Sequence, residues 1–148
     1  MTNELKYYSD SVPAIIAPAY TGDAGYDLMV SADGTIPAHG ISAIQLDLFL
    51  AIPEGHVGMI CDRSSMARRG MKVLGGIIDS QYRGRVAVIM ANLTDRPCIF
   101  EPGDRIAQLL VLPVNTPALV RVNEQTDLGY TERGAKAFGS SNVLKETA

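Results

Sequence analysis

One carboxylate stands three residues before an aromatic ring in residues 76–84 (GIIDSQYRG), and a strand-like apolar stretch follows at residues 86–90. An acid at the mouth of a β-hairpin can activate a water molecule, and a ring beside it can form one wall of a sugar-binding site. Asp, Tyr and Gly are also ordinary hairpin residues, so this segment alone is more typical of a turn in which Asp79 caps the backbone. Its interpretation depends on the rest of the chain.

Four further segments carry polar groups suited to phosphate or to a base. Ser64 and Ser65 open a short helical pattern, where hydroxyls and free backbone N–H groups can meet a phosphate or simply cap the helix. Gln108 is an amide inside an apolar run and needs hydrogen-bond partners. Phe138 lies in a Gly/Ser-rich tail with no core to join, which favours a binding role. The segments are residues 24–28 (AGYDL), 63–70 (RSSMARRG), 103–109 (GDRIAQL) and 133–141 (RGAKAFGSS).

With these segments in this order, the chain resembles the trimeric dUTPases over about residues 12–141. The resemblance implies hydrolysis of dUTP to dUMP and pyrophosphate, which keeps uracil out of DNA and supplies dUMP for thymidylate synthesis. It implies Mg²⁺ held chiefly by the triphosphate and water. It also implies a homotrimer whose sites each draw on three subunits: Ser64, Ser65 and Gln108 from one, the Asp79 hairpin from a second and the C-terminal tail from the third.

The resemblance also assigns residue roles. Asp79 orients and deprotonates the water that attacks the α-phosphorus, and Tyr82 lies beneath the deoxyribose, where it excludes a 2′-hydroxyl. The backbone of residues 74–78 reads uracil. No residue is expected to bind the metal directly, although Asp27 could act on it through water. The expected substrate-binding residues are Arg63, Ser64, Ser65, Leu74, Gly75, Gly76, Ile77, Ile78, Tyr82, Gln108, Arg133, Phe138, Gly139, Ser140 and Ser141.

Two positions depart from the usual family pattern. Asp62 stands where most relatives have a proline before Arg63. This acid would repel phosphate if it faced the site, or pair with a nearby arginine if it did not. Lys136 and Ala137 replace two glycines of the tail motif, which would strain a backbone that needs positive φ there, unless Lys136 adds a phosphate contact.

Glycines and prolines separate apolar or alternating stretches rich in β-branched residues, which cover residues 41–52, 57–61, 85–93 and 105–114. This pattern predicts an all-β sandwich or barrel with one short helix over residues 65–71, and the resemblance implies a jelly-roll type β-barrel. Residues 1–126 are expected to form the barrel domain. Residues 127–148 shift toward Gly, Ser and charge, which indicates a mobile tail. The resemblance implies that this tail is a flexible C-terminal arm exchanged in the homotrimer.

Composition narrows the remaining choices. The chain has 148 residues, a net charge of −3 and 47% apolar residues, which fits one folded domain and argues against nucleic acid as a partner. Cys61 and Cys98 lie in apolar surroundings and are interpreted as reduced core residues. The sequence contains no recognisable signal peptide or membrane span. The expected location is the cytoplasm, or the host cytoplasm if a virus encodes the chain.

Two rival functions share features with this sequence. dCTP deaminase also carries a segment like residues 63–68, but deamination in that family relies on a Glu in the strand after the hairpin, and residues 85–90 contain no acid. A binding protein that senses dUTP or docks to a regulator is the second rival. Asp79 argues against pure binding, while a regulatory protein partner is left open by the sequence.

Overall fold

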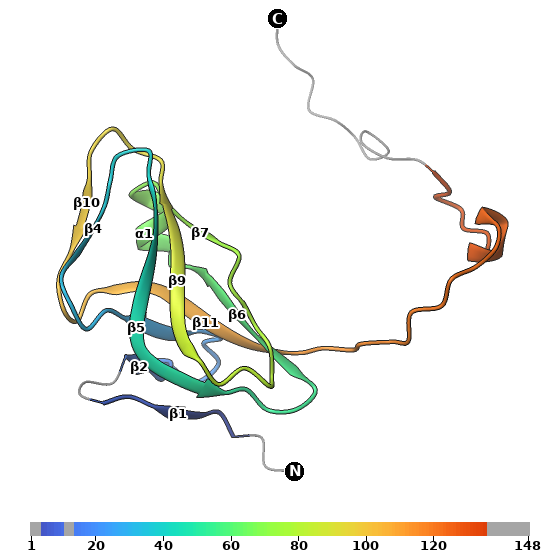
Figure 1. Ribbon diagram of the computed structural model, residues 1–148, viewed down its shortest axis with the longest axis horizontal. Helices are drawn as coiled ribbons and strands as arrows, with labels where there is room; N and C mark the ends of the chain where they lie inside the picture. Colours follow the sequence, from blue (N-terminus) through green and yellow to red (C-terminus); the bar gives the residue numbers. More distant parts are fainter. Residues whose placement is uncertain (1–3, 11–13, 136–148) are drawn as a thin grey trace, which may run out of the picture. The chain divides into compact units, whose positions relative to one another are not determined.

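Figure 1 shows the computed structural model of the chain, which describes residues 4–10 and 14–135. The chain divides into two units, Met1–Asn115 and Thr116–Ala148. All strands of the described residues lie in the first unit, together with one short α-helix, α1 (Ser64–Arg68). The predicted all-β class is therefore confirmed.

The strands form three antiparallel sheets. Hydrogen bonding between strands does not run round a closed barrel in the described part of the chain, because no strand is shared between two sheets. The four-stranded sheet has the order β1 (Lys6–Tyr8), β5 (Ile41–Ala51), β9 (Arg85–Asn92), β7 (Met71–Leu74); the five-stranded sheet has the order β2 (Ile15–Ile16), β3 (Tyr26–Met29), β11 (Arg105–Pro113), β6 (His56–Asp62), β8 (Ile77–Ile78); and β10 (Cys98–Phe100) pairs with β4 (Gly34–Ile36).

The core lies between the inner faces of the two larger sheets. Alternate residues of β5 and β9 are buried, among them Leu46, Leu48 and Val88, and they belong to one apolar cluster with Ile106 and Leu109 of β11. Each such side chain contributes about 1.5–3 kcal/mol on burial. The four long predicted strands are confirmed, and their ends differ from the predicted ends by one residue at most.

The short helix begins and ends earlier than predicted. Arg63 is extended (φ −83°, ψ 140°) and serves as the N-cap, and no side chain caps the helix. Ser64 and Ser65 are therefore its first residues, with their hydroxyls not used for capping. At the other end Gly70 adopts φ 78°, a conformation that favours glycine. Met71 then enters β7, so the predicted extension of the helix to residue 71 is wrong.

The second unit is described as far as residue 135. Its only regular element there is a 3₁₀ helix, η1 (Gln125–Leu128), which is closed by a capping box between Glu124 and Asp127. The chain divides at a different point from the predicted boundary at residue 126, and that domain assignment stays a prediction. Phe138, Gly139, Ser140, Ser141 and the Lys136-Ala137 pair lie outside the described residues. No helix of the described residues is long and apolar enough to span a bilayer.

Candidate active site

A cavity of ≈ 600 Å³ lies where α1, β3 and β11 meet. Its lining includes Asp27, Arg63, Ser64, Ser65 and Gln108, which the sequence predicted as neighbours of phosphate or metal. The sheet register brings them together, because Gln108 of β11 pairs with Asp27 of β3 on one side and with Cys61 of β6 on the other. We call this the phosphate cavity.

Asp27 holds two arginines in the wall of the phosphate cavity. Its Oδ1 lies 2.7 Å from Arg63 Nε, and its Oδ2 lies 3.3 Å from Arg63 Nη2 and 3.0 Å from Arg105 Nη1. The Arg63 and Asp27 side chains are 27% and 22% exposed, so water screens this two-point ion pair only in part. The charged lining of this cavity thus consists of two guanidinium groups, Arg63 and Arg105, and two carboxylates, of which Asp27 is bound to both arginines and Asp23 is the other.

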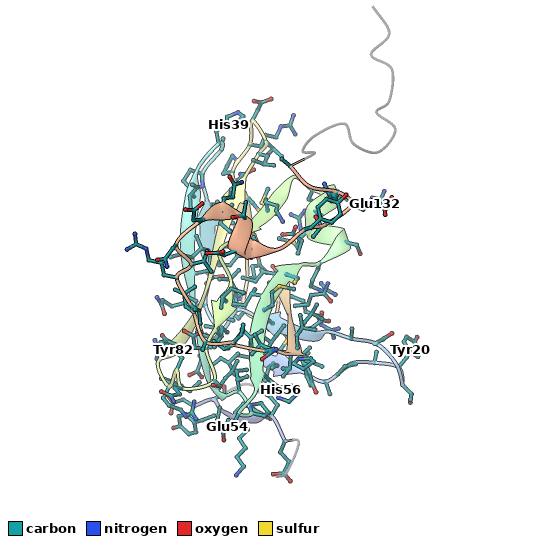
Figure 2. All side chains as sticks on the ribbon, turned by 90° about the vertical axis from the view of Figure 1, so that its right-hand side faces the viewer. Tyr20, His39, Glu54, His56, Tyr82 and Glu132 are labelled. Carbon is teal, nitrogen blue, oxygen red and sulfur yellow. The ribbon has the colours of Figure 1, made fainter. Side chains whose placement is uncertain are left out.

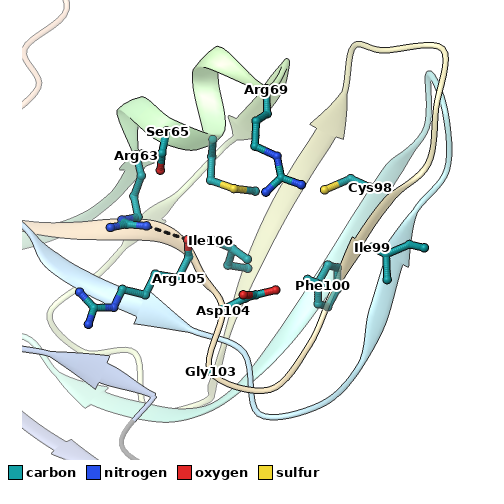
Figure 3. A pocket seen from close by; sticks show the side chains of 11 residues that line it. Arg63, Ser65, Arg69, Cys98, Ile99, Phe100, Gly103, Asp104, Arg105 and Ile106 are labelled. Carbon is teal, nitrogen blue, oxygen red and sulfur yellow. Dashed lines mark hydrogen bonds between the residues drawn. The ribbon is translucent and has the colours of Figure 1, made fainter.

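Arg105 also lines the phosphate cavity, and it was not among the predicted site residues, although it lies within the quoted segment 103–109. Its backbone oxygen also accepts a hydrogen bond from Arg63 Nη1 at 3.0 Å. Figure 3 shows this bond at the edge of a second cavity of ≈ 300 Å³, which adjoins the phosphate cavity and has the α1-flanking residue Arg69 on its other side. The basic residue two positions after a turn glycine was the available signal.

Gln108 has its amide fixed by two neighbours. Its Nε2 donates a hydrogen bond to the backbone oxygen of Asp62 at 2.8 Å, and a Cβ on Gly25 would lie only 2.3 Å from its Oε1. A side chain at position 25 would therefore displace the Gln108 amide from this position. Because the amide nitrogen carries two hydrogens, one of them remains for a phosphate oxygen.

Asp62, the acid that replaces the usual proline, points away from this cavity. Its Oδ2 lies 2.5 Å from Lys72 Nζ, and its Oδ1 accepts a hydrogen bond from the Val73 backbone N–H at 2.6 Å. Burial raises the pKa of Asp62, but the hydrogen bonds from Lys72 and Val73 and the charge of Lys72 together outweigh burial and hold the pKa below its usual value. The partner is thus a lysine, where an arginine was expected.

A separate cavity of ≈ 290 Å³ surrounds the predicted base and sugar residues, and we call it the hairpin cavity. Gly76, Ile77, Ile78, Asp79 and Tyr82 line it, whereas Leu74 and Gly75 do not. Gln45 and Arg85 line this cavity as well, although they were not among the predicted site residues. Their position near the cavity follows from the pairing of β5 with β9, which the sequence does not display.

The hairpin itself is a tight turn on a very short strand. Asp79 is exposed at the end of β8, and its backbone oxygen accepts a hydrogen bond from Tyr82 N–H at 3.0 Å. The Tyr82 hydroxyl donates to the Arg85 backbone oxygen at 2.9 Å, while the residue remains 45% exposed. Gly76 has φ 95°, and a Cβ there would lie 2.7 Å from the Ile60 oxygen. The ring is thus oriented but open on one side.

Asp79 and Arg63 lie at opposite ends of β6, although the lining of the hairpin cavity reaches along this strand as far as Ile60. Ile78 pairs with Gly58, so Asp79 follows opposite Val57, whereas Arg63 comes directly after the other end of the strand. At about 3.3 Å per residue, the six residues from Val57 to Arg63 span about 20 Å. Figure 2 shows Tyr82 at the end of the molecule that carries His56, the first residue of β6. The two cavities share no lining residue among those described.

Fold and site together define an all-β protein with one cavity lined by arginines, serines and a glutamine and another that presents a carboxylate and an aromatic ring. The dUTPase family model matches residues 13–142. The deoxyuridine 5′-triphosphate nucleotidohydrolase of Oryza sativa subsp. japonica is 41% identical over 121 residues, covering 81% of this chain and 69% of that protein. The one from Paramecium bursaria Chlorella virus 1 is 41% identical over 123 residues, covering 82% and 85%.

A solved structure gives the same result. The dUTPase of Staphylococcus bacteriophage 80alpha with dUPNHPP superposes with a TM-score of 0.86 at 29% identity, covering 96% of this chain and all of that one (100%). The chain belongs to the dUTPase family. Its individual residue roles remain predictions, and Arg133 belongs to the second unit, Thr116–Ala148.

Proposed function

We infer that the chain is a dUTP diphosphatase, which hydrolyses dUTP to dUMP and pyrophosphate. Its membership of the dUTPase family supports this activity, and one structural observation links the activity to named groups. An exposed carboxylate, Asp79, and an oriented ring, Tyr82, share the hairpin cavity. A dUTPase needs these two groups beside the α-phosphorus and the deoxyribose.

Asp79 acts as the general base. A water molecule beside its carboxylate attacks the α-phosphorus in line with the bridging oxygen that leads to the β-phosphorus. As the new P–O bond forms and the old one breaks, the water proton passes to Asp79 and pyrophosphate leaves. The exposure of Asp79 at the end of β8 lets the carboxylate reach this water.

Selectivity comes from the rest of the hairpin. The backbone amide and carbonyl groups of residues 74–78 pair with uracil, and cytosine is rejected because its donors and acceptors are reversed. The positive φ of Gly75 (65°) and Gly76 (95°) shapes this backbone. The ring of Tyr82, tied by its hydroxyl to Arg85, leaves no room for a ribose 2′-hydroxyl.

A complete site requires more than one subunit. A triphosphate that is attacked beside Asp79 is far too short to reach Ser64 and Ser65 of the same chain, which lie about 20 Å away along β6. In a homotrimer, the phosphate cavity of one subunit faces the hairpin cavity of a second. The arm of the third supplies Arg133 to the γ-phosphate, and Phe138, Gly139, Ser140 and Ser141 of its last motif close over the nucleotide.

Mg²⁺ is the proposed cofactor, held by the triphosphate and water. Within the described residues no three of His, Cys, Asp and Glu gather into a metal site, and both oxygens of Asp27 already contact arginines. Such a donor set suits a cation that arrives with the phosphates, with Asp27 reaching it only through water. When bound, the ion offsets phosphate charge. The related dUTPase of phage phi11 of S. aureus, at 25% identity and a TM-score of 0.74, coordinates a structural Mg(II) ion.

The activity is assigned to the cytoplasm, or to the host cytoplasm if the chain is viral, because both cysteines are free, as in reducing compartments. There it keeps uracil out of DNA and supplies dUMP. The net charge of −3 argues against a nucleic-acid partner. A regulatory protein partner has no support in the described residues.

The test is pyrophosphate release from dUTP, dTTP, dCTP and UTP at equal concentrations. A site that reads uracil by hydrogen bonds rejects an analogue with reversed donors by roughly four orders of magnitude. We expect dUTP to be hydrolysed far faster than the other three. Similar rates on dCTP and dUTP would contradict the assignment.

A further inference from the structure

Asp62 connects the two larger sheets at the point where the active-site segments begin. It is the last residue of β6 in the five-stranded sheet, whereas its carboxylate partners Lys72 and Val73 belong to β7 in the four-stranded sheet. Its backbone oxygen accepts the hydrogen bond from Gln108 on β11. This residue of β6 therefore contacts two other strands, β11 in its own sheet and β7 in the four-stranded sheet.

The contact to Val73 supplies an acceptor that the sheet does not. Within the described part of the chain, β7 is an edge strand that pairs with β9 alone, so N–H groups on its other side have no strand there to bind. Asp62 accepts one of these at Val73, and Gly76 O accepts a hydrogen bond from Ile60 N–H at 2.8 Å. β6 is thus hydrogen-bonded to the chain at Val73 and at Gly76, on both sides of residues 74–75, where the uracil-reading turn begins.

The negative charge of Asp62 is compensated by the ion pair with Lys72. The carboxylate is 23% exposed and is absent from the lining of the phosphate cavity, although Arg63 follows it directly. Lys72 offsets the negative charge, which would otherwise repel phosphate across a short distance. The Asp62–Lys72 pair therefore allows an acid to stand next to an anion-binding segment.

We propose that Asp62 is a positioning residue that fixes the phosphate-binding residues 63–65 relative to the uracil-reading hairpin of the same chain. This inference rests on the proposed function, because in the shared site those two segments serve neighbouring active sites. Asp62 therefore couples the geometry of two sites in one trimer. It touches neither the substrate nor the reacting atoms.

A double-mutant cycle on the pair tests the charge compensation. Lys72→Met leaves the Asp62 charge beside the phosphate segment, so KM for dUTP should rise several-fold, and more at low salt, with kcat changed less. Adding Asp62→Asn removes that charge while keeping an acceptor for Val73 N–H, so KM should return toward the wild-type value. If Lys72→Met leaves KM unchanged, or if the double variant is worse than Lys72→Met, the compensation is refuted.

Asp62→Ala tests the positioning. Losing two hydrogen bonds to a charged group should raise KM roughly tenfold or more. It should also speed amide hydrogen exchange at Val73 and through residues 74–76. Asp95→Asn is the matched control, because its carboxylate meets only His39 on the exposed surface, 2.7 Å away, and both readouts should stay at wild-type values. Unchanged KM and exchange in Asp62→Ala would overturn the proposal.

Mixed trimers test the coupling between sites. In trimers refolded from Asp79→Asn and Ser65→Glu chains, each working site combines the phosphate cavity of the former with the hairpin of the latter. Asp62→Ala placed on either chain should raise KM at those sites. An effect from the Asp79→Asn chain alone would restrict Asp62 to phosphate binding and refute the coupling.

The proposed function fails separately from this inference. If the wild-type chain releases no pyrophosphate from dUTP, the activity assignment is wrong. The hydrogen-exchange comparison does not depend on turnover, and it still decides whether Asp62 holds the turn.

Discussion

The phosphate cavity and the hairpin cavity are built in opposite ways. The first joins α1, β3 and β11, and ion pairs and hydrogen bonds within the chain hold its polar groups, above all the grip of Asp27 on Arg63 and Arg105. The second presents Asp79 on a turn that follows the two-residue strand β8, with the carboxylate exposed. The polar groups of the phosphate cavity are therefore held by contacts within the chain, whereas the carboxylate of the hairpin cavity is exposed to solvent.

This difference follows from what each half must do. Arginines that bind phosphate lose less conformational entropy on binding if an acid already holds them. A general base, by contrast, must keep its carboxylate unpaired so that it can accept a proton from water. Mutations in the phosphate cavity should therefore affect binding and stability together, whereas a mutation of Asp79 in the hairpin cavity should affect the chemistry alone.

Asp79→Asn gives the largest expected effect. It keeps the shape of the side chain and removes the proton acceptor, so kcat should fall by a factor on the order of a hundred to ten thousand. Binding of a non-hydrolysable dUTP analogue, measured by calorimetry, should survive, and so should Tm, because Asp79 is exposed. Near-normal turnover would assign the base to another residue.

Asp27→Asn should show the opposite profile. It removes the charge that holds Arg63 and Arg105, so KM for dUTP should rise, and stability should fall by about 1–3 kcal/mol, because the two guanidinium groups lose a charged partner. Steady-state kinetics and urea unfolding measure the two effects. If Asp27→Asn lowered kcat with stability and KM unchanged, the contrast between the cavities would not hold.

Tyr82 should control the sugar rather than the rate. Tyr82→Ala should reduce the preference for dUTP over UTP by roughly ten- to a hundredfold, because the wall that excludes the 2′-hydroxyl is lost. Tyr82→Phe keeps the ring and loses only the hydrogen bond to Arg85, so its preference should change little. Competition between the two nucleotides measures the ratio, and equal ratios in wild-type and Tyr82→Ala chains would remove Tyr82 from sugar selection.

The smallest expected effect is the pH dependence that Asp62 gives to the stability of the fold. The pKa of Asp62 in the folded chain lies below the usual 3.8, so its contribution to stability is present above pH 3.8 and is lost as the pH falls through the folded pKa. The Tm difference between the wild-type chain and Asp62→Asn should therefore be constant near neutrality and shrink below pH 3.8. A difference that grows in acid would reverse the sign assigned to the shift.

The long strands could be predicted because they carry the signal of a half-buried sheet. Alternate burial along β5 reproduces the alternation of apolar residues in its sequence. The short strands β7 and β8 could not be predicted in this way, because two to four residues show no reliable period. Their pairing depends on contacts with β9 and β6, which the sequence does not display.

The site residues divide in the same way, into those that sequence motifs predict and those that only strand pairing reveals. Asp79, Ser65 and Gln108 were found through ordered motifs, and the structure places each of them in a cavity. Arg105 and Arg85 were missed because only strand pairing brings them to the cavities. The expected partner of Asp62 was an arginine. The actual partner, Lys72, lies in β7 and comes close to Asp62 only because α1 reverses the direction of the chain between them.

Complementation between inactive chains tests most directly whether the site is shared. Asp79→Asn chains keep the phosphate cavity, and Ser65→Glu chains keep the hairpin but repel phosphate. Refolded together in equal amounts, they should recover roughly a quarter of wild-type activity, because half the phosphate cavities and half the hairpins are intact and the two meet independently in a symmetric trimer. If mass measurements show mixed trimers and activity stays at the level of the separate variants, each site lies within one chain, and the shared site is refuted.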